Sequence, residues 1–334
     1  MYSTIKPIIG ITMGDAAGIG PEIIDKALST EEIYRICRPI VIGDSKVIED
    51  AQKVAHTHLK IKPVKKVSEA GFFYGTIDIL DLNNIILEKL TMGQPQAMAG
   101  KASFEYIQRA IQLALKGEIQ AVTTAPISKE ALHMAEYNYP GHTEILADLT
   151  GSKEYAMMFV AGTLRVILAT IHVSLREACD LITKETVLTT IKLAHQTMQK
   201  IGIKEPKIAV AGLNPHASEG GLFGSEEIDE IMPAVDSAKG LGFNVIGPLP
   251  ADTIFYRAKK GDFDIVVAMY HDQGCIPIKL LGFEIGVNIT VGLPIVRTSV
   301  DHGTAYHRAG LRLGTANPLS LIEAIKLAAK LSQA

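Results

Sequence analysis

The stretch FDIVVAMYHDQGCIPIK, residues 263–279, combines a buried-strand pattern with an abrupt polar end. Its run of apolar, β-branched residues is typical of a strand that helices cover on both faces. The run ends at His271, Asp272 and Gln273, and Gly274 follows. Ligands of open α/β sheets bind beyond the carboxyl ends of the strands, so we expect this junction to form part of a ligand-binding or catalytic site.

Short apolar runs alternate with amphipathic segments along the whole chain. PIIGITM (7–13) and KIAVAGL (207–213) are typical of strands, and residues 102–118 and 184–202 are typical of helices. This alternation predicts an α/β fold with largely parallel sheets. The length of 334 residues fits about two domains of ~150 residues each.

Composition and charge narrow the class of protein. Hydrophobic residues are 47% and charged residues 21%, which is ordinary for a soluble globular protein. The formal net charge of -3 makes nucleic acid a poor partner. Three scattered cysteines argue for a reducing compartment, and we expect a cytoplasmic protein. Residues 1–15 lack a signal-peptide pattern, and no apolar run approaches the ~18 residues of a membrane span.

Histidines follow three of the predicted strands. His172 follows RVILATI, His216 follows KIAVAGL, and His271 follows DIVVAMY. A lone histidine there is more often a structural hydrogen-bonding group, but three equivalent positions predict a divalent-metal site. Imidazole suits Zn, Co, Ni or Mn, and added carboxylates shift the preference toward Mn or Mg. Asp252 and Asp272 are candidates to orient the imidazoles or to hold metal-bound water.

Two further regions indicate an anionic ligand. His142 and Thr143 lie at a predicted helix start, where N–H groups, an imidazole and a hydroxyl suit an anion. An ordinary threonine cap is the equal alternative. Lys279, Asn288 and Arg297 follow YHDQG in a segment of low charge, so we expect them to meet a buried anion rather than solvent alone.

Long motifs occur in order over nearly the whole chain. They read GDAAGIGPE, TAPISKEAL, PGHTEILADLTG, IHVSLREA, GLNPHASEGGLFGSEE, PADT, YHDQG and GVNITVGLPIVRTSVDHGTA. On these motifs the chain resembles the 4-hydroxythreonine-4-phosphate dehydrogenase (PdxA) family of vitamin B6 synthesis. The resemblance implies two α/β/α domains of isocitrate/isopropylmalate dehydrogenase type, with the active site in the interdomain cleft. We place the first domain at 1–128 plus about 300–334, and the second, with metal and dimer contacts, at about 129–299.

The resemblance also implies roles for single residues. A homodimer would share across its interface a metal site made by His172, His216 and His271. The substrate contacts would be His142, Thr143, Lys279, Asn288 and Arg297. The candidate catalytic residues are Lys279, Asp272 and Asp252. The general base stays open among Asp272, Lys279 and a metal-bound hydroxide. NAD would accept the hydride, at residues that the motifs do not identify.

Two departures distinguish this chain from the B6 enzymes. Those enzymes read GEPAGIGPE where this chain has Asp15 and Ala16, and here CIPIKLLGFEIGVN follows YHDQG. We therefore predict the second branch of the family, which acts on 4-phospho-D-threonate or 4-phospho-D-erythronate. NAD would oxidise the 3-hydroxyl with the help of a divalent cation (Zn, Mg, Mn or Co), and decarboxylation would give dihydroxyacetone phosphate.

Three alternatives remain open at this point. The first is the B6 enzyme, 4-hydroxythreonine-4-phosphate dehydrogenase itself. The second, less favoured, is a metal-dependent acyl- or phosphotransferase on a similar scaffold. The third is a non-catalytic metabolite-binding protein, which would not need three histidines suited to a metal.

Overall fold

The computed structural model describes residues 6–333, which form two compact units. Unit 1 consists of residues 6–152 and 293–333, and unit 2 consists of residues 153–292. The domain limits expected at 128/129 and near 300 stay a prediction. Residues 1–5, which belong to the stretch without a signal-peptide pattern, and residue 334 lie outside the described residues. None of the helices in the described part is long and apolar enough to cross a membrane.

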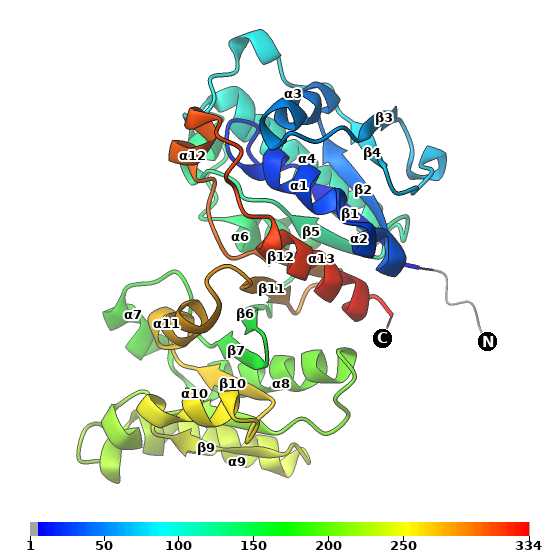
Figure 1. Cartoon of the computed structure of the whole chain (residues 1–334). Coiled ribbons are helices and arrows are strands. Elements are labelled where there is room, and N and C mark those ends of the chain that lie inside the picture. The colour runs from blue at the N-terminus through cyan, green and yellow to red at the C-terminus, as the bar shows by residue number, and fades with distance from the viewer. Residues whose placement is uncertain (1–5, 334) are drawn as a thin grey trace, which may run out of the picture. The chain divides into compact units, whose positions relative to one another are not determined.

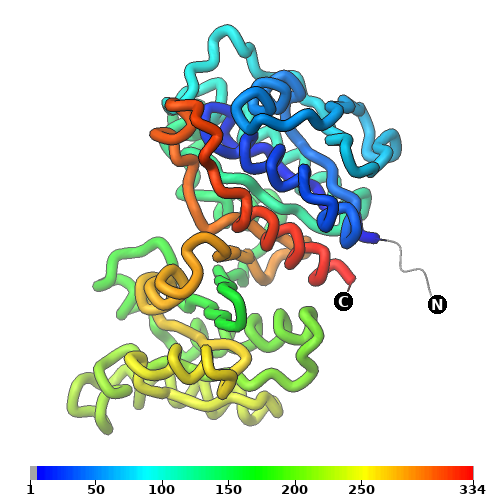
Figure 2. The backbone as a smooth tube through the Cα atoms, viewed as in Figure 1, coloured from blue at the N-terminus to red at the C-terminus, as the bar shows by residue number. Residues whose placement is uncertain are grey.

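Unit 1 contains a parallel sheet with the strand order β3-β4-β2-β1-β5-β12. Its strands are β1 (Ile8–Thr12), β2 (Arg38–Gly43), β3 (Lys60–Val64), β4 (Thr76–Asp81), β5 (Ala121–Thr124) and β12 (Val296–Val300). Its helices are α1 (Gly20–Leu28), α2 (Glu31–Ile36), α3 (Ser45–Ala55), α4 (Ala97–Leu115), α5 (Lys129–Met134), α6 (His142–Thr150), α12 (Tyr306–Leu311) and α13 (Leu319–Leu331). Helix α13 packs against α1 and α2, whereas α4 packs against α5 and α6 (Figure 1). The C-terminal helix therefore lies beside the first helices of the chain (Figure 2).

Unit 2 contains a mixed sheet with the strand order β11-β6-β7-β10-β8-β9. Its strands are β6 (Ala156–Ala161), β7 (Leu164–Leu168), β8 (Ile208–Ala211), β9 (Val245–Leu249), β10 (Ile265–Ala268) and β11 (Val287–Val291). Its helices are α7 (Leu175–Leu181), α8 (Lys184–Lys200), α9 (Met232–Gly240), α10 (Ala251–Lys259) and α11 (His271–Gly282). Strand β6 is antiparallel to β7 and β11, and β7, β10, β8 and β9 run parallel.

The buried strands explain why these sheets form. All residues of β8 and β10 are buried, and their sequences, IAVA and IVVA, are apolar on both faces. Val166, Ala209 and Val266 of the central strands pack with Cys275 and Ile278 of α11. Each fully buried valine or isoleucine contributes about 1.5–3 kcal/mol to folding. The mixed α/β fold with largely parallel sheets confirms the predicted fold class.

Gly100 of α4 marks a close approach between α4 and α5. A Cβ at this position would lie 1.9 Å from the carbonyl oxygen of Ala131. In a helix interior alanine is normally favoured over glycine by about 1 kcal/mol. Here the obstacle is backbone of a neighbouring helix, which cannot rotate away as a side chain can.

We predict that Gly100→Ala lowers the free energy of unfolding by about 1–3 kcal/mol, because overpacking outweighs the gain in helix propensity. Urea denaturation measures the change. Gly240→Ala, at the last residue of α9, is the matched control, since no described atom beyond its chain neighbours and the adjacent backbone of its own helix lies within 4 Å of the added Cβ. That control should be neutral or stabilising, and a Gly100→Ala chain as stable as the wild type would contradict the prediction.

Candidate functional site

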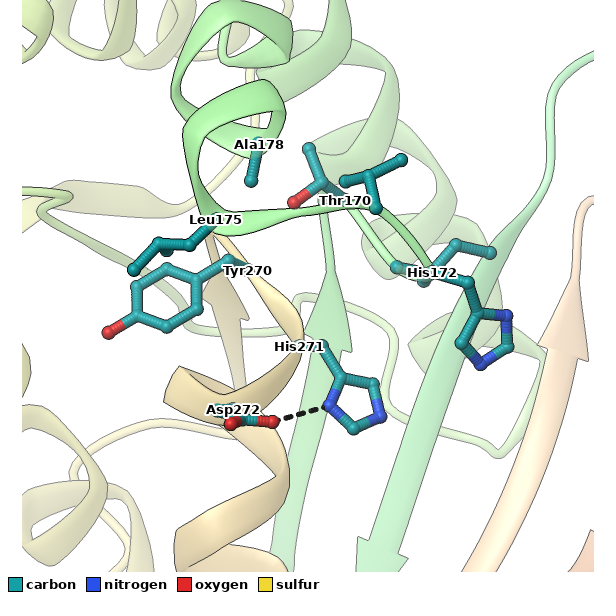
Figure 3. Close-up of a pocket in the computed structure, with 9 residues that line it drawn as sticks. Thr170, His172, Leu175, Ala178, Tyr270, His271 and Asp272 are labelled. Atoms are coloured by element: carbon teal, nitrogen blue, oxygen red, sulfur yellow. Dashed lines mark hydrogen bonds and ion pairs between the residues drawn. The ribbon is translucent and has the colours of Figure 1, made fainter.

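Two of the strand-end histidines lie together in unit 2. Strands β7 and β10 are parallel neighbours, so their carboxyl ends lie side by side. His172 follows β7, and His271 begins α11 just beyond β10. Their ring centroids are 6.0 Å apart. Both rings line a hollow of ≈ 320 Å³, to which Thr170 and Tyr270 also contribute (Figure 3).

Asp272 contacts the ring of its neighbour His271. The Nδ1 atom of His271 lies 2.7 Å from a carboxylate oxygen of Asp272, as the dashed line in Figure 3 shows. A carboxylate at this position keeps the proton on Nδ1 and leaves Nε2 available as a ligand atom. The Asp272 side chain is 72% exposed. One of the predicted roles of Asp272, that of orienting an imidazole, therefore has a hydrogen bond to support it.

Gly274 sets how closely the first turn of α11 approaches the sheet. A Cβ at this position would lie 2.4 Å from a methyl carbon of Leu168 and 2.8 Å from one of Val166. Both are residues of β7. The glycine therefore lets the helix that begins at His271 pack directly onto the strand that leads to His172.

His216 lies in a left-handed turn. Its φ and ψ are 53° and 29°, and φ is also positive at Ala217, Ser218 and Glu219. Non-glycine residues in this region cost of order 1–3 kcal/mol each, and such strain persists only where the surroundings impose it. The turn is therefore a feature that the neighbouring residues must hold in place.

The carboxylate of Glu227 holds the start of this turn. Its Oε1 accepts a hydrogen bond of 2.6 Å from the backbone N–H of Asn214, and its Oε2 accepts one of 2.9 Å from Nδ2 of the same residue. The Asn214 amide also donates to Glu226 at 2.7 Å. Glu227 is 1% exposed, so this clamp is shielded from water. Glu227 is the last residue of the motif GLNPHASEGGLFGSEE, but the sequence alone does not indicate such a clamp, because it does not show that the Glu227 carboxylate contacts the backbone of Asn214.

The third histidine lines a neighbouring hollow. His216 and Asp252 border a hollow of ≈ 670 Å³, which shares Tyr270 and Asp272 with the hollow of His172 and His271. Within residues 6–333, no three His, Cys, Asp or Glu side chains are grouped closely enough to hold a metal ion. The structure therefore brings two of the three predicted ligands together, and the three-histidine site stays a prediction.

A second polar cluster lies in unit 1. Arg297 of β12 is 2% exposed, and its guanidinium donates a 2.7 Å hydrogen bond to the hydroxyl of Thr124 in β5. His142 and Thr143 form the first turn of α6, as the sequence predicted. The Nε2 atom of His142 is buried and has no hydrogen-bond partner among the described residues. A buried cation, an unsatisfied imidazole and a helix N-terminus are together suited to an anion.

Burial controls the ionisation of this cluster. Burial lowers the pKa of Arg297 to about 9, although the negative charge of Glu144 opposes the shift. Burial, together with the positive charge of Arg297, holds the pKa of His142 well below its usual range. At neutral pH the cluster therefore carries one cationic guanidinium beside a neutral imidazole.

The remaining predicted substrate contacts are in unit 2. Lys279 lies on α11, with its ammonium 5.7 Å from the ring centre of Phe283. Asn288 lies on β11, and its Oδ1 is buried without a hydrogen-bond partner among the described residues. Neither residue lines the two hollows of the histidines.

Asp15, one of the residues that departs from the B6 pattern, is fully buried in the turn after β1. Its carboxylate accepts hydrogen bonds of 2.8 Å from the N–H of Ala17 and from the hydroxyl of Tyr306. Burial nevertheless raises its pKa to about 6. Asp15 therefore joins the first turn of unit 1 to α12.

Comparison with known proteins gives a consistent result over the full length. The model of the family described as pyridoxal phosphate biosynthetic protein PdxA matches residues 35–328. The chain is 53% identical over 331 residues to D-threonate 4-phosphate dehydrogenase of Cupriavidus necator, covering 99% of this chain and 98% of the relative. It is also similar to a solved 4-hydroxythreonine-4-phosphate dehydrogenase from Burkholderia phymatum, with a TM-score of 0.86, 50% identity, and coverage of 98% and 99%.

A more distant likeness concerns the fold alone. A β-decarboxylating dehydrogenase from Thermococcus kodakarensis has a TM-score of 0.52 and 14% identity, covering 96% of this chain and 82% of that one. This likeness confirms the predicted relation to dehydrogenases of the isocitrate type at the level of fold. The family match and the identity of 53% over nearly all residues show that the chain belongs to the PdxA family.

Proposed function

We propose that the chain oxidises the 3-hydroxyl of 4-phospho-D-threonate or 4-phospho-D-erythronate with NAD and then releases carbon dioxide, giving dihydroxyacetone phosphate. The observation that carries this proposal is the 53% identity to a relative named D-threonate 4-phosphate dehydrogenase. The second candidate is the B6 reaction, because a solved structure with 50% identity is named 4-hydroxythreonine-4-phosphate dehydrogenase.

The proposal assigns an anionic group of the substrate to the cluster of unit 1. The guanidinium of Arg297 can make two parallel hydrogen bonds to a phosphate or carboxylate. The buried Nε2 of His142 is an unsatisfied polar atom that such a group would satisfy. Thr143 and the first turn of α6 add a hydroxyl and backbone N–H groups. Lys279 and Asn288 are the proposed contacts in unit 2.

The strand-end residues of unit 2 fit a divalent cation in two respects. His172 and His271 are near enough to bind one ion, since imidazole nitrogens lie about 2 Å from a bound metal. The hydrogen bond that Nδ1 of His271 donates to the Asp272 carboxylate leaves Nε2 of His271 available. We propose His216 as the third ligand. A bound cation would supply Lewis acidity, lowering the pKa of the substrate hydroxyl.

The residues of the chain then serve a reaction in two stages. In the first, the hydroxyl proton passes to a base, and bound NAD would supply the acceptor for the hydride that C3 loses. Asp272 is engaged with His271, so Lys279 is our candidate for that base, and Asp252 keeps its predicted role of orienting an imidazole or holding metal-bound water. In the second, the bond from C2 to the carboxylate breaks, carbon dioxide leaves, and C2 takes up a proton.

We also propose a homodimer that shares the metal site across its interface. Several apolar side chains of unit 2 are largely exposed in the single chain: Leu222 (72%), Ile276 (64%), Leu280 (83%) and Phe283 (65%). The last three lie on or next to α11, the helix that begins with His271. Exposed apolar groups near a functional helix are typical of a surface that a partner covers.

We predict that 4-phospho-D-threonate or 4-phospho-D-erythronate is oxidised with a higher kcat/KM than 4-phosphohydroxy-L-threonine. The substrates differ at C2, where one carries a hydroxyl and the other an ammonium, and a mismatched polar group costs orders of magnitude in kcat/KM. NADH absorbance with each acid, at one pH and with one metal, measures the preference. A preference for the amino acid would assign the chain to the B6 reaction. Absence of NADH with every acid would favour a transferase.

We predict that Arg297→Lys weakens substrate binding by about 1.5–3 kcal/mol, or roughly 10- to 100-fold, because lysine cannot replace a two-pronged contact. The KM for NAD should change little. Steady-state kinetics with each substrate varied in turn measures both constants. If Arg297 is only a structural ion pair, the thermal midpoint will fall while the KM for substrate stays at the wild-type value.

We predict that His271→Ala and Lys279→Ala are each inactive, and that mixing the two proteins restores part of the activity. In the proposed dimer the metal ligands of one subunit face the substrate contacts of its partner, so a hybrid dimer would contain one site in which His271 and Lys279 are both native. Subunit exchange is followed with two differently labelled proteins, and NADH formation is measured on the exchanged sample. Exchange without any recovery would contradict a shared site.

A further inference from the structure

A chain of hydrogen bonds links the ends of the three strands that precede the histidines. The side chain of Gln273 is at its centre. Its Oε1 accepts a 2.7 Å hydrogen bond from the backbone N–H of Met269, and its Nε2 donates a 2.8 Å hydrogen bond to the carbonyl of Gly212. One amide therefore spans the residue after β10 and the residue after β8.

The chain continues from β10 to β7. The carbonyl of Met269 accepts hydrogen bonds from the backbone N–H of Thr170 at 3.1 Å and from its hydroxyl at 2.8 Å. Met269 is fully buried and Thr170 is 5% exposed, so water competes little for these groups. The order of the links is Thr170, Met269, Gln273 and Gly212.

The linked residues stand just before the three histidines. Thr170 is followed two residues later by His172, Met269 two residues later by His271, and Gly212 four residues later by His216. Beyond these points the chain leaves the ladder of the sheet, and backbone pairing no longer fixes the distances between neighbouring segments. The side chain of Gln273 connects the segments after β10 and β8 at the point where the backbone hydrogen bonds of the sheet end.

We propose that Gln273 is a positioning residue that sets the spacing of His216 relative to His172 and His271 for a divalent cation. This role rests on the proposed function, because it concerns the same metal site. Gln273 does not touch the cation. It acts through the backbone at Gly212 and Met269, as groups behind metal ligands commonly do, and their loss typically costs 10- to 100-fold in metal affinity.

The test compares the divalent-cation affinity of the full chain with that of Gln273→Met. Methionine keeps the length of the side chain and removes both the donor and the acceptor. The probe is Zn²⁺ or Mn²⁺ alone, with the Kd measured by titration calorimetry or by competition with a chromophoric chelator. We expect a Kd roughly 10- to 100-fold weaker than that of the wild type. His271→Ala serves as the reference for loss of a ligand.

Gln96 provides a matched control in unit 1. Its side chain also accepts from a backbone N–H and donates to a backbone carbonyl, both of Thr91, at 3.1 and 2.7 Å. Gln96→Met therefore removes the same kinds of hydrogen bond away from the histidines. We expect it to lower the thermal midpoint at most, with the Kd for the cation unchanged.

Hydrogen exchange gives a readout that does not depend on bound metal. In Gln273→Met the amide of Met269 loses its acceptor, so it should exchange faster than in the wild type. If Gln273→Met fails to fold, Gln273→Glu replaces it. That variant keeps an acceptor for Met269 but sets a carboxylate oxygen against the Gly212 carbonyl, and the Kd should weaken likewise.

The outcomes separate the two proposals. A folded Gln273 variant with the Kd of the wild type would overturn the positioning role while leaving the metal site intact. A wild-type chain that binds neither cation would contradict the metal part of the proposed function, and the positioning role with it. Equal weakening in Gln96→Met would show a general loss of stability and would also overturn the role.

Discussion

Parallel strands end at the same edge of a sheet, and the candidate chemistry of unit 2 depends on that constraint. Strands β7, β10 and β8 are neighbours, so the segments that leave them begin side by side. Histidines follow all three strands, and the rings of two of them, His172 and His271, have centroids 6.0 Å apart although they lie 99 positions apart in sequence. Packing of α11 against β7, which Gly274 makes possible, then fixes the height of His271 above the sheet edge.

The candidate site also depends on a strained backbone segment, the left-handed turn at His216. The left-handed turn at His216 is unfavourable for each of its non-glycine residues, and the shielded carboxylate of Glu227 opposes that cost through Asn214. A hydrogen bond to a charged acceptor contributes about 1.5–3 kcal/mol, which is the scale required to hold one such residue. Strained backbone of this kind persists only where the surrounding structure imposes it, and it clusters at active sites and ligand clamps.

Much of the fold follows from the sequence, and the exceptions have a physical cause. Apolar runs such as IVVA at β10 and IAVA at β8 predicted central strands, because both faces of these strands are buried. The run VRTSV at β12 did not predict a strand, because its polar residues are not typical of a buried strand, although they are buried. In the structure, Arg297, Thr298 and Ser299 of this strand are buried, and Thr298 bonds to the hydroxyl of Thr123 at 3.0 Å.

The site was predictable to a similar extent. The sequence identified His172, His216 and His271 as candidates because they follow predicted strands, and His142 because it lies at the start of a predicted helix. The roles of Gln273 and Glu227 depend on contacts with backbone atoms of Gly212 and Asn214, and no periodicity of the sequence reports such contacts.

As the proposed contact of an anionic substrate group, the buried guanidinium of Arg297 would couple the stability of the folded protein to ligand binding. An anion that binds there only in the folded state would stabilise that state by mass action. Chains without ligand would populate the unfolded state more often, and proteases act on that state. We therefore expect the enzyme to persist longer in cells that supply its substrate, so that supply of the metabolite regulates the amount of the protein without any change in its synthesis.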